Sequence, residues 1–122
     1  ALKLDPKQLE PRFNLARIAL EQNDIKKSEL EYLGVLGVNP YNETAMIKLA
    51  QLSYAKKNTD AMLNWLNKAR ENNKMSIQSR LILHNYYSLN KDLDNALIIS
   101  NELYKIQEDN LNILKLHADN LL

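Results

Sequence analysis

The chain has 122 residues, of which 45% are hydrophobic and 25% are charged, a composition that fits one globular domain and excludes a disordered chain. Its formal net charge of +1 gives no electrostatic reason to expect a nucleic acid or an anionic membrane as partner. The absence of Cys excludes disulfides, thiolate metal sites and Cys nucleophiles.

Apolar residues recur at three- and four-residue steps, the spacing of amphipathic helices. Met46, Leu49 and Ala50 show this spacing, and the chain has only two Gly and three Pro. We therefore predict an all-α fold. The predicted helices cover about 9–22, 25–38, 42–56, 59–72, 76–90, 93–107 and 110 to the end of the sequence.

Polar residues stand where most of these helices begin. Asp24, Thr59, Ser76 and Asp92 are predicted N-caps, because their side chains can accept a hydrogen bond from an unpaired backbone N–H of the first turn. Pro40 is expected to prevent the helix before it from continuing.

The sequence repeats at a step of 34 residues, and this period of two helices is typical of stacked helical repeats. Pro6 and Pro40 are one step apart. Further columns at the same step are Leu15, Leu49 and Leu83, and Ser28, Met62 and Ala96. We predict repeats at 9–42, 43–76 and 77–110, preceded by the end of another repeat at 1–8 and followed by a partial repeat at 111–122. The chain is thus expected to be a fragment of a longer array.

This pattern resembles the tetratricopeptide repeat family, whose units are helix pairs of this length. The residues that carry the resemblance are Leu15, Ala16, Ser28, Tyr32, Val35, Pro40, Leu49, Ala50, Met62, Leu66, Ala69, Leu83, Tyr87, Ala96 and Leu103. The chain departs from the family where an aromatic is usual, at Arg12, Met46 and Arg80, and where Gly is usual between helices, at Asn23, Lys57 and Lys91. The resemblance implies a right-handed α-solenoid of about three repeats plus one extra helix.

The first helix of each repeat would line the concave face of such a solenoid, where equivalent positions align. The predicted peptide-binding residues are Phe13, Asn14, Arg17, Leu20, Ile47, Lys48, Gln51, Tyr54, Leu81, Ile82, Asn85 and Ser88. Apolar side chains mixed with amides and two cations suit a protein or peptide partner of acidic character. The alternative is a solvated face that binds nothing. The family's set of side chains that clamps a peptide carboxylate is broken here, which disfavours that mode of binding.

No catalytic residue, cofactor site or metal site is expected. His84 and His117 are nearly one repeat apart, but no carboxylate or Cys recurs with them. The better interpretation is that His84 occupies a helix crossing usually held by Gly or Ala, where it either bonds a carbonyl or spreads the helix pair. The expected function is a non-catalytic protein-interaction scaffold. The alternatives are a recruitment arm of a larger enzyme or of a cell-envelope assembly factor, and an RNA-binding helical repeat, which would show a steep dependence on salt.

The segment 76–110 also resembles, more distantly, the repeat arrays of bacterial envelope lipoproteins associated with exopolysaccharide and PEP-CTERM protein-sorting systems. That resemblance implies a bacterial scaffold outside the inner membrane. The segment itself is not expected to contact a membrane. Leu114, Leu121 and Leu122 are expected to form an apolar stripe on the terminal helix, through which copies of the chain could associate.

Overall fold

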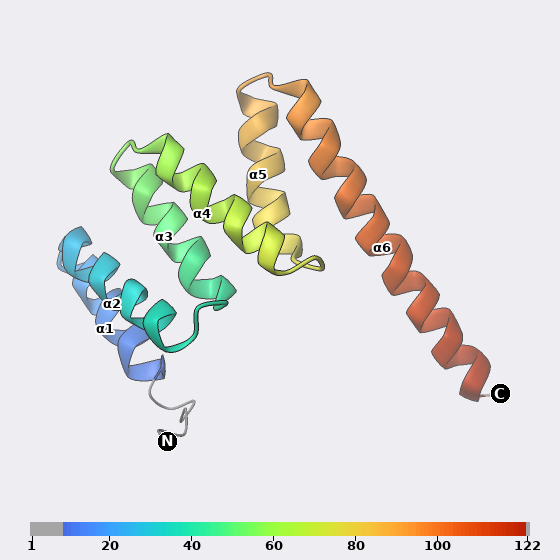
Figure 1. Ribbon diagram of the computed structural model, residues 1–122, viewed down its shortest axis with the longest axis horizontal. Coiled ribbons are helices and arrows are strands. Elements are labelled where there is room, and N and C mark those ends of the chain that lie inside the picture. Colours follow the sequence, from blue (N-terminus) through green and yellow to red (C-terminus); the bar gives the residue numbers. More distant parts are fainter. Residues whose placement is uncertain (1–8, 122) are drawn as a thin grey trace. The chain divides into compact units, whose positions relative to one another are not determined.

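The computed structural model describes the backbone of residues 9–121 and the side chains of residues 9–111. The predicted segment 1–8 and the side chains of Leu114, His117, Leu121 and Leu122 therefore lie outside the described residues. Within the described chain the fold is all-α and contains six helices and no strand (Figure 1). These are α1 (Leu9–Glu21), α2 (Ile25–Val38), α3 (Glu43–Ala55), α4 (Thr59–Asn72), α5 (Ile77–Leu89) and α6 (Leu93–Leu121).

The helices pair as three hairpins that fall into two compact units. The first unit ends at Asn73 and contains α1 to α4; the second begins at Lys74 and contains α5 and α6. In the first unit α1 packs against α2 and α3 packs against α4, while α2 also packs against α3. In the second unit α5 packs against α6. Figure 1 shows each hairpin as two neighbouring ribbons joined by a short turn.

The turns inside the three hairpins have the same backbone geometry at 34-residue steps. Asn23, Lys57 and Lys91 have φ values of 61°, 62° and 59°, in the left-handed region that favours glycine. At these three positions the tetratricopeptide repeat pattern usually has Gly, whereas this sequence has Asn or Lys. In each turn the next residue donates its N–H at 2.8 Å to a carbonyl five positions earlier: Asp24 to Ala19, Asn58 to Ser53, and Asp92 to Tyr87.

Replacing Lys57 by Gly is expected to raise the free energy of unfolding by about 0.5–1 kcal/mol, because Gly adopts this positive φ without steric cost. The gain is a net value, since Gly also increases the conformational entropy of the unfolded chain. Urea unfolding followed by circular dichroism would measure it. Lys57→Ala is the control, because Ala removes the side chain and keeps the unfavourable φ. Equal stability of the Gly and Ala variants would contradict the prediction.

Side-chain N-caps begin several of the helices, and those of α2, α4 and α6 directly follow the turns with positive φ. The structure confirms Asp24, Ser76 and Asp92 as residues whose side chains accept a backbone N–H in the first turns of α2, α5 and α6. The prediction of Thr59 is wrong: the Asn58 side chain accepts the N–H at 3.2 Å, and Thr59 is the first helical residue. The reason is the turn geometry, which places the cap immediately after the residue with positive φ.

The predicted break between the last two helices is also absent. Helix α6 runs without interruption from Leu93 to Leu121, 29 residues in all, so residues 110 to 121 do not form a separate helix. At the equivalent repeat position, by contrast, α2 does end. Its last residue is Val38, two residues before Pro40, which cannot continue a helix. Residues 107–110 have the sequence QEDN, with neither Pro nor Gly, and nothing there forces a helix to end.

The core of the first unit lies between α1, α2 and α3. Phe13 packs its ring 5.9 Å from that of Tyr32 at an interplanar angle of 56°, a tilted arrangement favourable for aromatic pairs. Burial raises the pKa of the Tyr32 hydroxyl above its usual value of 10.0, because the charged phenolate is poorly solvated there. The buried residues of this cluster, which we call the first-unit core, are Ala16, Tyr32, Val35, Ala45, Leu49 and Leu52.

One buried hydroxyl in α2 is unsatisfied. Ser28 is fully buried, and its Oγ has no hydrogen-bond partner within the described residues. By contrast, the Oγ of Ser53 donates to the carbonyl of Leu49 at 2.9 Å. The column that contains Ser28 has Met62 and Ala96 at the next two steps, so an apolar side chain is compatible with this position.

Ser28→Ala is therefore expected to stabilise the chain by about 1 kcal/mol, because it removes a desolvated hydroxyl that gains no hydrogen bond in return. Thermal and urea unfolding would measure the change. Ser53→Ala is the matched control: it removes a hydroxyl that is bonded, and we expect it to give no gain. A loss of stability in Ser28→Ala would show that the hydroxyl is satisfied in solution.

Candidate protein-binding face

Helix α1 exposes three of its four predicted binding residues. Asn14, Arg17 and Leu20 are exposed, whereas Phe13 is partly buried against the first-unit core. The Nη1 of Arg17 donates to Oε1 of Glu21 at 3.1 Å, and both side chains are 63% exposed. A pair of this kind on a helix surface contributes at most about 0.5 kcal/mol. Arg17 can therefore exchange it for a carboxylate on a partner at little cost.

Helix α3 presents only a narrow strip to solvent, because α2 and α4 both pack against it. Lys48, Gln51 and Tyr54 are exposed, with Tyr54 at 64%. Lys48 forms no ion pair with any described residue, so its charge is available to a partner. Ile47 is only 2% exposed, which places it in the core and not at the surface where the sequence pattern put it. The strip is therefore more polar than predicted.

Helix α5 in the second unit carries the remaining predicted residues. Leu81, Asn85 and Ser88 are exposed, and Ile82 is half-buried. Because Leu81, Asn85 and Ser88 are spaced at i, i+4 and i+7, they share one side of the helix. Nine of the twelve predicted residues are thus exposed. The other three are buried or half-buried: Phe13, Ile47 and Ile82.

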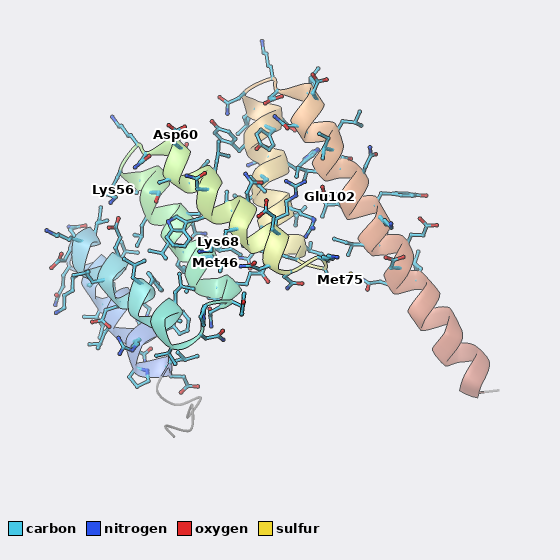
Figure 2. All side chains as sticks on the ribbon, viewed as in Figure 1. Met46, Lys56, Asp60, Lys68, Met75 and Glu102 are labelled. Carbon is cyan, nitrogen blue, oxygen red and sulfur yellow. The ribbon has the colours of Figure 1, made fainter. Side chains whose placement is uncertain are left out.

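A shallow hollow on α4 was not assigned a binding role by the sequence pattern. Its volume is about 300 Å³, and it is lined by Ala61, Asn64, Trp65 and Lys68, which are spaced at i, i+3, i+4 and i+7 on one side of the helix. The Nζ of Lys68, labelled in Figure 2, lies 5.5 Å from the centroid of the Trp65 ring, within the range of a cation–π contact. Trp65 also packs against the first-unit core, as its apolar ring predicts.

Among residues 9–121, no helix combines the length and apolar content that crossing a bilayer requires. Among the described side chains, those of residues 9–111, no three His, Cys, Asp or Glu are grouped so that they could hold a metal ion. His84 is half-buried on α5.

Comparison with known proteins does not assign the chain to a family. No protein-family model matches the sequence, and no curated protein matches it. The exposed strips of α1 and α3 combine charged, amide and apolar side chains that a partner could contact.

Proposed function

We propose that this chain is a non-catalytic scaffold that binds a partner protein or peptide, and that its helix pairs stack as a tetratricopeptide-like solenoid with the first helix of each pair on the concave face. The turns recurring at 34-residue steps support a repeat of this kind. A single observation carries the binding proposal: exposed cations and exposed apolar side chains share the solvent-facing strips of α1 and α3. They are Arg17 with Leu20, and Lys48 with Tyr54.

The chemistry of these strips favours an acidic segment with interspersed apolar residues. Arg17 offers a planar guanidinium that can bind a carboxylate through two hydrogen bonds, and Lys48 adds a second positive charge. Leu20 and Tyr54 provide apolar surface that loses water when covered, and Tyr54 retains a hydroxyl for hydrogen bonding. Amide groups of Asn14 and Gln51 can bind backbone N–H and C=O groups of an extended peptide.

The double variant Arg17→Ala/Lys48→Ala is expected to weaken binding of acidic peptides about tenfold, since two exposed charge contacts of about 0.7 kcal/mol each add to about 1.4 kcal/mol. Fluorescence anisotropy with a panel of acidic and neutral peptides would measure the affinities. The melting temperature is expected to stay unchanged because both side chains are exposed.

Lys26→Ala/Lys27→Ala provides the matched control, because it removes the same charge from exposed positions on α2. We expect it to leave the affinity for acidic peptides nearly unchanged. Equal weakening in the two double variants would mean that net charge, and not the strips of α1 and α3, attracts the peptide. A lowered melting temperature in Arg17→Ala/Lys48→Ala would place these side chains in a structural role instead.

A further inference from the structure

Helix α6 carries an uncovered apolar stripe. Leu93, Leu97 and Tyr104 are spaced by four and seven residues and so lie on one side of the helix; they are 71%, 60% and 70% exposed. We call these three residues the α6 stripe. The buried residues of the same helix lie on another side, and in the second unit α6 has α5 as its packing neighbour. These buried residues are Ala96, Ile99 and Ile106.

The equivalent side of α2 is covered. Two 34-residue steps before the α6 stripe stand Ile25, Glu29 and Leu36, and all three are half-buried. Ile25 and Leu36 pack against the first-unit core, part of which is contributed by α3. Glu29 forms an ion pair with Lys56, the residue that follows α3. Helix α3 packs against α2, and the ion pair of Glu29 brings the C-terminal end of this next helix to the same side.

The sequence that would correspond to α3 is present in the second half of α6. Asn110 stands two steps after Asn42, which caps α3 by accepting the N–H of Ala45 at 2.9 Å. The segment 107–110 has the same length as the connection 39–42 between α2 and α3. After it, apolar residues follow at i, i+3, i+7 and i+10, the spacing of an amphipathic helix: Leu111, Leu114, Ala118 and Leu121.

In the straight form of α6 this segment cannot reach the stripe. Leu121 lies roughly 42 Å along the helix axis from Leu93, at 1.5 Å per residue. The 13 residues of α5 span roughly 20 Å at the same rise, so α5 can accompany only about half of α6. Figure 1 shows the far half of α6 extending beyond the end of α5. Residues 107–111 are all exposed, so burial of these side chains contributes little resistance to bending at this point.

We propose that α6 is a two-state element. It breaks at residues 107–110, and residues 111–121 fold back antiparallel onto Leu93, Leu97 and Tyr104, as α3 covers α2. The folded-back form occupies the α6 stripe and prevents another helix from docking there. The straight form leaves the stripe open. The conformation of α6 thereby regulates access to an apolar surface of the second unit, independently of the binding proposed for α1 and α3.

Distance measurement between two spin labels tests this directly, since the chain contains no Cys. Labels at Asp94→Cys and Asp119→Cys would be separated by roughly 38 Å along a straight helix. In the folded-back form the separation falls below about 20 Å, because packed helix axes are about 8–10 Å apart. We expect both distances in the otherwise unchanged chain. Glu108→Pro, which repeats the position of Pro40, should shift the population to the short distance. Glu108→Ala should shift it to the long one.

Two variants show whether the α6 stripe is the docking surface. Added to Glu108→Pro, Leu97→Glu is expected to abolish the short distance, whereas Ile98→Glu, at an exposed position off the stripe, should preserve it. A long distance alone in Glu108→Pro, with the helix content of the chain retained by circular dichroism, would overturn the proposal. So would a short distance that appears only between singly labelled chains after mixing, because the occupant would then be a second copy of the chain.

Discussion

Glu102→Ala is expected to lower the free energy of unfolding by about 2–3 kcal/mol, because it removes the carboxylate beside a buried arginine. The Nε of Arg80 donates to Oε1 of Glu102 at 2.9 Å, and its Nη1 donates to the carbonyl of Ser76 at 2.8 Å. The Arg80 side chain is only 7% exposed and that of Glu102 is 30% exposed. Figure 2 labels Glu102 on α6. Without Glu102, the guanidinium remains desolvated and loses the carboxylate oxygen that its Nε bonds.

Removal of the arginine instead of the glutamate is expected to lower the free energy of unfolding much less. In Arg80→Met the remaining carboxylate of Glu102 is partly exposed and can turn toward water, so we expect a loss of about 1 kcal/mol or less. Met is already present one step earlier in the same column, as Met46, which is fully buried. The double variant Arg80→Met/Glu102→Gln should recover most of the stability lost in Glu102→Ala.

Urea unfolding followed by circular dichroism would measure these changes. Glu31→Ala is the control, because Glu31 lies 4.0 Å from Nη1 of Arg12, whose side chain is 43% exposed. That substitution should change the stability by less than about 0.5 kcal/mol. If Arg80→Met destabilises the chain as much as Glu102→Ala, the cost comes from the lost pair itself and not from a charge left buried.

Leu49→Ala is expected to lower the free energy of unfolding by about 3 kcal/mol. Truncation of a buried leucine loses the transfer free energy of the removed atoms and leaves a cavity. Leu49 is 3% exposed and belongs to the first-unit core. Leu15 occupies the same column one step earlier but is 44% exposed, and Leu15→Ala should cost less than about 1 kcal/mol.

The difference between the two leucines follows from the neighbours of their helices. Helix α3 packs against both α2 and α4, whereas the main described neighbour of α1 is α2. Thermal and chemical unfolding of the two variants side by side would test the prediction. Similar losses in both would mean that Leu15 is buried in solution by a contact that the structure does not contain.

Local signals in the sequence predicted most of the helix boundaries. The 34-residue step located the turns at Asn23, Lys57 and Lys91, although none of them is a glycine, because the apolar spacing fixes where each helix ends. Pro40 marked one junction correctly. The junction expected after Gln107 failed for the complementary reason: a repeat position alone does not end a helix when the residues there are compatible with helical backbone.

The exposure of the candidate binding residues was less predictable. Periodicity identifies the side of a helix but not how much of its circumference its neighbours cover. Ile47 and Lys48 are adjacent in the sequence, yet Ile47 is buried and Lys48 is exposed, since α3 is packed on two sides. Phe13 similarly turns to the core through its contact with Tyr32. The sequence does not indicate that the Ser28 hydroxyl lacks a hydrogen-bond partner among the described residues, because this depends on which carbonyls lie near it in the fold.

Because one turn geometry recurs in the three hairpins, a chain of this kind can be lengthened by duplication without a new backbone conformation at the junction. Asn23, Lys57 and Lys91 share nearly the same φ and the same 2.8 Å backbone bond in the turn that follows. A tandem duplication of one 34-residue segment that starts within such a turn would rejoin the polypeptide in a conformation already present elsewhere in it. New copies would then require no change of backbone conformation at the joint.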